Sequence, residues 1–426
     1  METKFAIISR LSAENPEMVF NQLMHHFNKE NLLSWYQSLK GKAAVGIDGM
    51  TKGKYGENLE ENLDALLRKL KTMSYIPGPV KQISIPKEGR NGATRPLGIG
   101  NFEDKIVQKG VQKILEAIYE PLFWNSSYGF RPKLGCHDAI KALRGHLYSQ
   151  SVRNVIDLDL SNYFGTIDHD LLMAQLSNKI QDKRFLRYIR RMFKAGVLSN
   201  GELTVSDEGV PQGSICSPIL ANIYAHYALD DWFNRTVKIN CRGRVEIFRY
   251  ADDAVICCEN AKDAERIRAA LPKRLSKFKL KLNKDKTKTL VFNRFEKENS
   301  QSFDFLGFTF YLGLTKGGKV VPKLKSSGKK LRSKLSRVNE WCKENRNTVP
   351  LPELWESFCR KLAGHVQYYG ISFNSKTVQG FILKSVKMFF KWINRRSQRK
   401  SMTFEKFALF MLRFPPPKAK IYHRLF

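Results

Sequence analysis

The sequence predicts an α+β fold, in which a mixed body of helices and strands is followed by a basic, helical C-terminal unit. Hydrophobic segments are spread along all 426 residues and apolar residues make up 42%, so the chain can bury a large core. Strand-like segments bounded by turn residues fall between residues 80 and 310. From residue 325 onward they give way to helical segments dense in Lys and Arg.

The first elements follow from periodicity and turn residues. Residues 15–75 have the pattern of amphipathic helices and are interrupted by the glycine-rich turn GIDGMTKG at 46–53. The segment 80–100 has two strand-like halves around a Gly/Asn turn, which is typical of a hairpin. Residues 102–123 have helical periodicity, and Pro121 marks the end of that helix.

The later elements alternate between strands and helices. A strand closes at residue 160 in VRNVIDLDL, and helices follow it. A second hairpin is centred on RYADDAVICC at 249–258, and a third strand pair includes FDFLGFTF at 303–310. The sequence contains no internal repeat.

The charge balance indicates a polyanionic partner. There are 73 Lys and Arg against 40 Asp and Glu, a net charge of +33, which favours salt-dependent binding of nucleic acid. Basic residues interleave with aromatic residues, as in grooves that follow a nucleic-acid backbone and stack bases. A ribosomal or chromatin-like protein can be equally basic but usually carries low-complexity basic tails. A solvated basic surface stays open as the simpler interpretation.

The seven cysteines lack the paired C-x-x-C spacing of a zinc site, and their odd number without a secretory signal is typical of a reduced, cytoplasmic protein. They are Cys136, Cys216, Cys241, Cys257, Cys258, Cys342 and Cys359. No apolar stretch approaches the ~20 residues that a membrane helix needs. We therefore expect a soluble protein without a membrane partner.

Adjacent carboxylates at a strand turn are the first sign of chemistry. Asp252 and Asp253 lie at the centre of FRYADDAVICC, and two neighbouring carboxylates repel one another unless solvent or a cation compensates. Asp is common in turns, so a solvated hairpin turn is the alternative. The turn lacks Gly and Asn, however, which distinguishes it from an ordinary tight hairpin.

A second acidic strand end strengthens the interpretation as a metal site. Asp159 ends the strand in NVIDLDLSNYF, and carboxylates at the ends of adjacent strands can converge on one point. Carboxylate oxygens suit Mg²⁺, and two such ions ~4 Å apart can activate a 3′-hydroxyl and stabilise pyrophosphate. Asp157, on the same strand face, is the more buried of the pair and is expected to be structural.

These residues resemble motifs of reverse transcriptases, specifically of those encoded by group II introns. Tyr250-Ala251-Asp252-Asp253 matches the YADD box of that family, and Asp159 falls at its first catalytic aspartate. The other matching blocks follow in family order and cover nearly the whole chain: GIDGMT (46–51), IPK…RPLGI (85–99), SSYGFRPKLGCHDAI (126–140), EGVPQGSICSPILANIYAHYALD (208–230), LKLNKDKTK (280–288) and FDFLGF (303–308).

The resemblance implies a right-hand polymerase fold. Its parts are a helical N-terminal extension over 1–75, fingers with part of the palm over 76–155, a palm with an antiparallel sheet over 156–312, and a helical, basic thumb or maturase-like domain over 313–426. It also implies an RNA-directed DNA polymerase that uses dNTPs, an RNA template and two Mg²⁺ ions, with Mn²⁺ as a substitute, and forms an RNA–DNA hybrid. Asp159, Asp252 and Asp253 would hold the metal, with the Leu160 backbone as a further candidate ligand.

The resemblance assigns nucleotide contacts residue by residue. Lys87 and Arg95 would hold the incoming triphosphate, since Arg binds phosphate through a bidentate fork. Phe164, five residues after Asp159, would exclude a ribonucleotide's 2′-hydroxyl by steric clash. A plain core phenylalanine and ordinary surface charges are the alternatives. Gly165 departs from the family, which often has aspartate there, at a position that binds no metal.

The PQG segment and two further residues complete the expected nucleotide pocket. Gln212 and Gly213 would line it, because a glycine permits close approach of the backbone to a ligand. The alternative is a turn that merely begins a helix. Tyr250 of the YADD box and Lys286, a candidate proton donor to pyrophosphate, also match family positions.

The C-terminal segment 364–407 resembles the thumb, or maturase, region of the same enzymes. Aromatic residues at helical spacing in this segment and just before it are expected to form a helix-bundle core: Trp355, Phe358, Tyr368, Tyr369, Phe389, Phe390 and Trp392. The basic run Arg395, Arg396, Arg399 and Lys400 would face outward and bind RNA phosphates, or alternatively form a solvated basic face.

The biological role stays open between two interpretations. Mobile intron enzymes commonly continue into a DNA-binding region and an endonuclease, and the sequence stops at Phe426 without them, so we expect target cleavage to be lost or supplied elsewhere. We favour a bacterial reverse transcriptase that copies a dedicated structured non-coding RNA in antiviral defence. An endonuclease-free maturase that mainly binds and splices intron RNA is the alternative. A vestigial site on an RNA-binding protein and an RNA-dependent RNA polymerase are the other classes to exclude.

Overall fold

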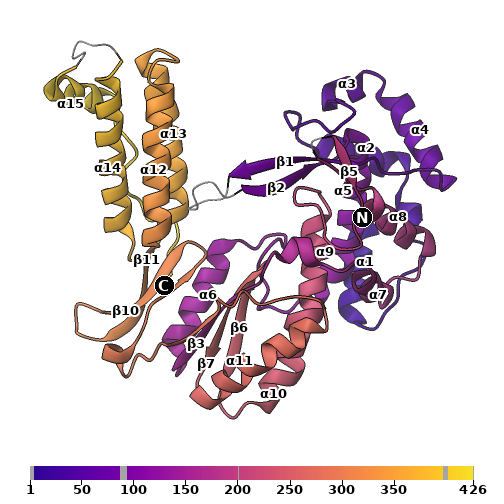
Figure 1. Ribbon diagram of the computed structural model, residues 1–426, viewed down its shortest axis with the longest axis horizontal. Helices are drawn as coiled ribbons and strands as arrows, with labels where there is room; N and C mark the ends of the chain where they lie inside the picture. Colours follow the sequence, from indigo (N-terminus) through magenta and orange to yellow (C-terminus); the bar gives the residue numbers. More distant parts are fainter. Residues whose placement is uncertain (1–3, 87–93, 200, 397–401, 426) are drawn as a thin grey trace. The chain divides into compact units, whose positions relative to one another are not determined.

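The chain divides into two compact units, each with its own core. The computed structural model describes residues 4–86, 94–199, 201–396 and 402–425 (Figure 1). Unit 1 comprises Met1–Lys87, Gly92–Ala139 and Leu158–Thr289, and unit 2 comprises Glu88–Asn91, Ile140–Asp157 and Leu290–Phe426. The finer division into extension, fingers, palm and thumb stays a prediction. Helices and strands are mixed in the first three hundred residues and helices dominate the end, as the α+β prediction requires.

The N-terminal part of unit 1 is helical, as the periodicity predicts. Its elements are α1 (Lys4–Glu14), η1 (Leu23–His26), α2 (Lys29–Ser38), α3 (Lys52–Glu57) and α4 (Leu59–Lys71). Asn28 and Thr51 cap α2 and α3 by accepting hydrogen bonds from backbone N–H groups of the first turn. The sequence pattern missed α1, which packs on α5 (Phe102–Tyr119) and whose Ser12 donates a 2.6 Å hydrogen bond to the Ile118 carbonyl.

The predicted hairpin over 80–100 is confirmed. Strands β1 (Val80–Pro86) and β2 (Thr94–Ile99) pair antiparallel, with Ile85 opposite Arg95. The short strands β4 (Val197–Ser199) and β5 (Glu202–Thr204) extend this sheet in the order β2-β1-β4-β5, and β4 runs parallel to β1. Figure 1 shows β1 and β2 as an extended two-stranded arm.

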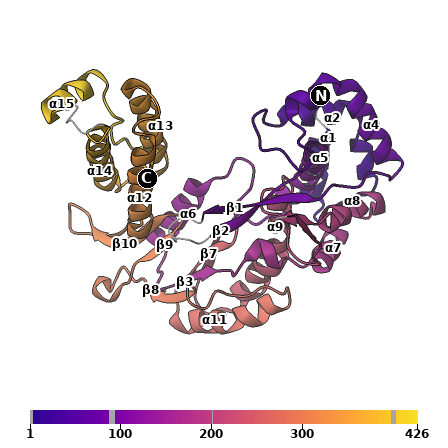
Figure 2. The ribbon, with the colours of Figure 1, turned by 45° about the horizontal axis from the view of Figure 1, so that its top comes forward.

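A second sheet carries the acidic residues. Its order is β6-β7-β3-β8, from β6 (Val245–Tyr250), β7 (Asp253–Cys258), β3 (Asn154–Asp159) and β8 (Lys288–Val291). The predicted hairpin at 249–258 is the antiparallel β6–β7 pair. Helix α11 (Ala261–Ser276) packs beside β7, and both views show it along this sheet (Figures 1 and 2). Strands β3 and β8 have residues in both units, whereas the acidic ends considered below belong to unit 1.

Further helices surround the centre of unit 1. They are η2 (Glu120–Leu122), η3 (Tyr163–Thr166), α7 (His169–Ser177), α8 (Lys183–Lys194), α9 (Ser217–Ala225), the π-helical η4 (His226–Asp230) and η5 (Phe233–Val237), and α10 (Lys238–Asn240); α6 (Cys136–Ser149) has residues in both units. Helix α5 is deeply buried among them, with Ile106, Val107 and Val111 fully inaccessible. Within the described ranges, no helix combines the length and apolar character needed to span a bilayer.

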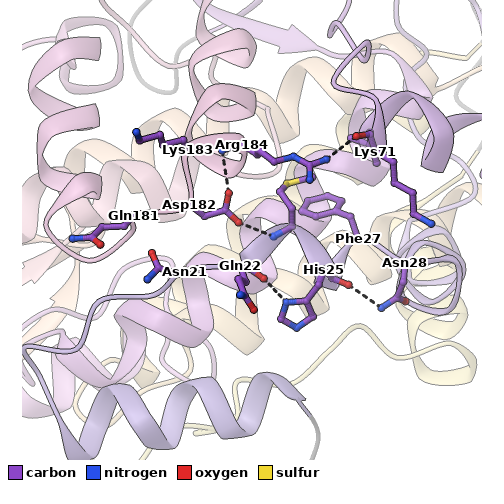
Figure 3. Close-up of a pocket in the computed structure, with 12 residues that line it drawn as sticks. Asn21, Gln22, His25, Phe27, Asn28, Lys71, Gln181, Asp182, Lys183 and Arg184 are labelled. Atoms are coloured by element: carbon purple, nitrogen blue, oxygen red, sulfur yellow. Dashed lines mark hydrogen bonds between the residues drawn. The ribbon is translucent and has the colours of Figure 1, made fainter.

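Three segments of unit 1 meet around a cavity of about 730 Å³ (Figure 3). Asp182 caps α8 by accepting 3.0 Å hydrogen bonds from the backbone N–H groups of Arg184 and Phe185, and it accepts a third from the N–H of Met24. The guanidinium of Arg184 donates to the Lys71 carbonyl at 2.7 Å. Asp182 and Arg184 therefore join the start of α8 to η1 and α4, and none of the residues lining this cavity is a candidate site residue.

Burial of Asp104 in unit 1 gives a prediction on stability. Burial raises the pKa of Asp104 from 3.8 to about 6, although Tyr75 and the Gly78 N–H donate to its carboxylate. A folded-state pKa above the unfolded one stabilises the protein at low pH, and this contribution is lost as the pH rises through about 6. The difference corresponds to roughly 3 kcal/mol. We expect Asp104 to lower the free energy of unfolding of the wild type by about this amount between pH 3 and pH 7.

The matching measurement is chemical denaturation of Asp104→Asn at both pH values. The variant is expected to lack this part of the pH dependence, whereas Asp170→Asn, on the exposed surface of α7, is expected to keep it. An equal pH dependence in the wild type and in Asp104→Asn would contradict the assignment.

Unit 2 contains a small sheet and a helical bundle. Strands β9 (Phe303–Phe305), β10 (Phe308–Leu314) and β11 (Val320–Ser326) form a sheet in the order β11-β10-β9, which confirms the predicted strands at 303–310. After the sheet come α12 (Gly328–Asn345), α13 (Leu351–Tyr369), α14 (Ser375–Ile393) and α15 (Phe404–Arg413); η6 (Lys297–Asn299) precedes it. Figure 2 shows α12, α13 and α14 grouped together. The region from 313 therefore begins with a strand, because β11 pairs with β10, and the helices start at Gly328.

The aromatic core predicted for this bundle is present. Trp355, Phe358 and Phe389 are buried, with ring centroids of Phe358 and Phe389 at 4.7 Å. Phe407 of α15 is fully buried against Phe390, at 5.0 Å between centroids. The hydrophobic faces of the helices, and not a ligand, account for this aromatic pattern.

Candidate active site

The candidate site is built around the turn between β6 and β7. Tyr250 pairs with Asp253, so Ala251 and Asp252 form a two-residue connection. Ala251 has φ of +57°, a left-handed conformation that glycine adopts far more readily than alanine. The conformation persists because the surroundings fix it, since such strain is retained only where neighbouring structure determines the backbone. The acidic turn is therefore held in place and is not a freely solvated loop.

Asp159 lies at the end of β3 and is held by the loop that precedes β8. Its backbone N–H donates to the Thr287 hydroxyl at 3.3 Å, and its carbonyl accepts from the Asn283 N–H at 2.9 Å. The Leu160 backbone, the further candidate ligand, forms an antiparallel bridge with Leu282. These bonds fix the position from which the Asp159 carboxylate projects.

Asp159 and Asp252 share one electrostatic environment. Burial raises the pKa of Asp252 above its ordinary value, and the charge of Asp159 raises it further, whereas Lys286 and Arg249 lower it. The Lys286 ammonium lies 2.6 Å from the Asp159 carboxylate. Two carboxylates and one ammonium group therefore act on one another electrostatically, as expected where acidic residues need a positive counter-charge.

Asp253 is brought to the same turn but is exposed. Among the residues that the structure describes, no three His, Cys, Asp or Glu side chains form a group that could hold a metal ion. The set of three aspartates therefore stays a prediction. The residues nevertheless fit a divalent ion chemically, because Asp159 and Asp252 offer hard oxygen donors and Lys286 already supplies a positive charge beside them.

Phe164 and Tyr250 lie on either side of a third ring, Phe130. The centroid of Phe130 is 6.0 Å from that of Phe164, in an edge-on arrangement, and 6.4 Å from that of Tyr250. Phe130 is 42% exposed and has φ of +59°. Burial raises the pKa of the Tyr250 hydroxyl, which interacts with the Cys136 thiol. Sequence reasoning missed Phe130, and only its place within the SSYGFRP block could have indicated it.

The segment around Gln212 and Gly213 packs on the hairpin. The Gln212 carbonyl accepts a 2.5 Å hydrogen bond from the Gly98 N–H, and Gly213 has φ of +110°. A Cβ at Gly213 would lie 2.4 Å from the Gly98 carbonyl oxygen. The close approach that the structure shows at Gly213 is to the backbone of β2. Its nucleotide role stays a prediction.

Gly213→Ala tests this packing. A left-handed alanine costs about 1–3 kcal/mol, and the contact with the Gly98 carbonyl adds to that cost. We expect a lower free energy of unfolding in denaturant titration. Gly53→Ala in α3, whose Cβ meets only the Thr51 hydroxyl at 4.0 Å, is the control and is expected to be neutral or to stabilise by about 0.5–1 kcal/mol. Equal effects of the two variants would contradict this explanation.

The phosphate-binding candidates are only partly described. Arg95 is exposed on β2 opposite Ile85, and Lys87 lies outside the described residues. Arg395 is exposed, with its guanidinium 5.2 Å from the Trp392 ring centroid. Arg399 and Lys400 also lie outside the described residues.

Arg396 differs from the expected outward-facing residue. Its guanidinium donates to the carbonyls of Arg346 and, at 2.6 Å, Val349, in the loop after α12. Carbonyl groups at and beyond a helix C-terminus lack helical partners, so a basic side chain satisfies them. Part of the Arg396 guanidinium is thus engaged within the bundle, and RNA binding by Arg395 stays a prediction.

The chain is similar to several known proteins. "Group II intron-encoded protein LtrA" of Lactococcus lactis subsp. cremoris is 35% identical over 230 residues, 53% of this chain and 38% of that protein. "Protein YkfC" of Escherichia coli (strain K12) is 36% identical over 284 residues, 59% of this chain and 73% of that protein. "Putative COX1/OXI3 intron 2 protein" of Saccharomyces cerevisiae is 33% identical over 231 residues, 52% and 26% respectively.

The family assignment rests on a separate match. The sequence pattern of the family described as reverse transcriptase (RNA-dependent DNA polymerase) matches residues 85–310. This range includes Asp159, Phe164, the turn at 250–253 and Lys286. Because the match spans more than half of the chain, the chain belongs to the reverse transcriptase (RNA-dependent DNA polymerase) family.

Proposed function

We propose that the chain is an RNA-directed DNA polymerase that extends a 3′-hydroxyl on an RNA template. The observation that carries this proposal is the ion pair of Asp159 with Lys286, close enough to Asp252 for both charges to act on its carboxyl, in a chain of the reverse transcriptase family. The net charge of +33 supports binding of an RNA template and an RNA–DNA hybrid.

The three aspartates would hold two Mg²⁺ ions, with Mn²⁺ as a substitute. Such ions supply Lewis-acid activation of the 3′-hydroxyl and stabilise the leaving pyrophosphate. With the charge of Asp159 compensated by bound cations, the Lys286 ammonium, which pairs with Asp159 at 2.6 Å, would be free to reach the nucleotide phosphates. There it donates a proton to pyrophosphate, as general acids do when positioned on a leaving group.

The remaining residues bind and orient the nucleotide. Lys87 and Arg95 hold the triphosphate, and Phe164 supports the sugar and excludes a 2′-hydroxyl. Gln212, Gly213 and Tyr250 line the remaining pocket. These roles are supported by the family match over 85–310 and by the aromatic contacts that join Phe164 to Tyr250 through Phe130.

Primer extension with the full chain tests the proposal. We expect incorporation of dTTP on a poly(rA) template with an oligo(dT) primer in Mg²⁺, lost on chelation and absent without the template. Preferential incorporation of UTP would identify an RNA-dependent RNA polymerase instead. Absence of incorporation with either nucleotide, in protein that still binds the RNA, would contradict a polymerase function and leave an RNA-binding protein with a vestigial site.

For the template we propose a dedicated structured non-coding RNA, copied in the bacterial cytoplasm in antiviral defence. Support comes from the presence of every polymerase block in sequence order. A maturase acting on intron RNA is the second candidate, favoured by the names of the intron-encoded relatives.

One experiment distinguishes the dedicated template from intron RNA. It sequences the nucleic acid that copurifies with the wild type and with the Asp252→Asn, Asp253→Asn double variant. One discrete RNA in both samples, with complementary DNA only in the wild type, would support a dedicated template. Intron RNA would support the maturase.

A further inference from the structure

The guanidinium of Arg249, on β6 next to Tyr250, is completely engaged inside unit 1. Its side chain is 1% exposed, and that of Asp230 is inaccessible. It donates to both Asp230 carboxylate oxygens at 2.8 and 2.6 Å and to the Ser127 hydroxyl at 2.6 Å. The remaining N–H groups donate to the Asn222 side-chain oxygen at 3.2 Å and to the Ala251 carbonyl at 2.9 Å. An arginine has five N–H donors, so each one has a partner.

One of these five bonds reaches the candidate catalytic turn itself. The Ala251 carbonyl belongs to the peptide group that joins Ala251 to Asp252, so Arg249 binds the turn at the residue with left-handed backbone. On the other side, a Cβ at Gly129 would lie 2.3 Å from the Ala251 nitrogen, so only glycine fits. The Gly129 carbonyl accepts from the Asn222 side chain at 2.6 Å. The turn is thus held between Arg249 and the Gly129 backbone.

The helix that supplies the acceptors is locally wound as a π-helix. Asn222 lies on α9 and Asp230 ends η4, eight residues later. A regular α-helix would rotate residue 230 about 80° away from residue 222. A π-helix rotates less per residue than an α-helix. The π-helical η4 therefore keeps the side chains of Asn222 and Asp230 on the face that meets Arg249. Short π-helical insertions are frequent at functional sites, and here the insertion has a specific geometric result.

We propose that Arg249 is a positioning residue, held by Asp230, Asn222 and Ser127, that fixes the turn carrying Asp252 for metal binding and catalysis. The proposal rests on the polymerase function proposed above. Stability alone does not explain the arrangement, because well-packed hydrophobic residues usually replace a buried ion pair at no loss of stability. The five N–H donors of Arg249 point in fixed directions, and one of them binds the Ala251 carbonyl, so together they fix the position of the turn.

Arg249→Lys is the first variant to compare with the wild-type full chain. Lysine keeps the charge but not the planar fork, so it cannot reach Asp230, Asn222 and Ala251 together. We expect kcat to fall about 10–100-fold, with little change in the KM for dTTP, and Mn²⁺ binding without nucleotide to weaken about 10-fold by calorimetry. Amide hydrogen exchange of residues 250–253 is expected to accelerate.

Arg274→Lys is the matched control. Arg274 on α11 donates to the carbonyls of Ala228 and Tyr227, next to the same π-helical segment, but has no bond to the turn. It is expected to keep both kcat and Mn²⁺ affinity. Equal losses in Arg249→Lys and Arg274→Lys would overturn the proposal.

The double variant Arg249→Met, Asp230→Leu distinguishes a role in positioning the turn from a role in stability. It also tests the proposal if Arg249→Lys fails to fold. Its melting temperature is expected to match the wild type, while Mn²⁺ affinity and protection of residues 250–253 stay low. Recovery of Mn²⁺ affinity together with the melting temperature would show a purely structural ion pair and overturn the proposal. If the wild type incorporates no nucleotide, the polymerase function fails, whereas the Mn²⁺ and exchange measurements still test the positioning role.

Discussion

Asp252→Asn is expected to lower the rate of dNTP incorporation about 1,000-fold while RNA affinity stays within about twofold of the wild type. Metal ions supply several kilocalories per mole of transition-state stabilisation, and each 1.36 kcal/mol is a factor of ten in rate. Asparagine keeps the shape of Asp252 but removes the negative charge that, with Asp159, attracts a cation. Single-turnover primer extension measures the rate, and filter binding on the same RNA measures affinity.

Asp170→Asn is the control for this variant. Asp170 is an exposed carboxylate on α7 that pairs with Arg190 at 3.3 Å, and exposed pairs contribute little to stability. It is expected to behave as the wild type in both assays. If Asp252→Asn keeps the wild-type rate, the turn is not part of the catalytic site. If the variant loses RNA binding, the substitution disturbs the fold.

Phe164→Ala is expected to reduce discrimination between dTTP and UTP by about 10–100-fold, chiefly through faster use of UTP. The Phe164 ring is held edge-on by Phe130 and Tyr163, at 6.0 and 5.7 Å between centroids. In the role proposed for it, a ring fixed in this way would exclude a 2′-hydroxyl by steric clash, whereas alanine would leave space for it. The measurement is kcat/KM for each nucleotide on the same poly(rA) template.

Two further variants define the origin of this discrimination. Phe164→Tyr keeps the ring and is expected to keep the preference for dTTP. Phe130→Ala removes one of the rings that holds Phe164 and is expected to give a smaller loss in the same direction. If Phe164→Ala leaves the ratio unchanged, Phe164 is a core residue and another group selects the sugar.

Local sequence patterns predicted the elements whose partners lie nearby. The hairpins at 80–100 and 249–258 are present because each consists of two strand-like halves around a short turn, so pairing closes a small loop. The helix predicted over 102–123 is present as α5, in line with its apolar periodicity. Helix α1 was missed, because its partner α5 lies far along the chain.

By itself, the sequence determined the chemical groups of this protein: the acidic turn at 252–253, the acidic strand end at Asp159, and the order of motifs shared with reverse transcriptases. These features depend only on residue types and short spacings.

Only the tertiary structure decided which groups support these acidic residues or compensate their charge. Lys286 pairs with Asp159 across 127 positions, and Arg249 reaches Ser127 across 122. Position 129 requires glycine because the turn at Ala251 leaves no space for a Cβ. Asp230 reaches Arg249 from a π-helical turn. No local pattern encodes such contacts, because they form only when the packing of the whole unit brings distant segments together.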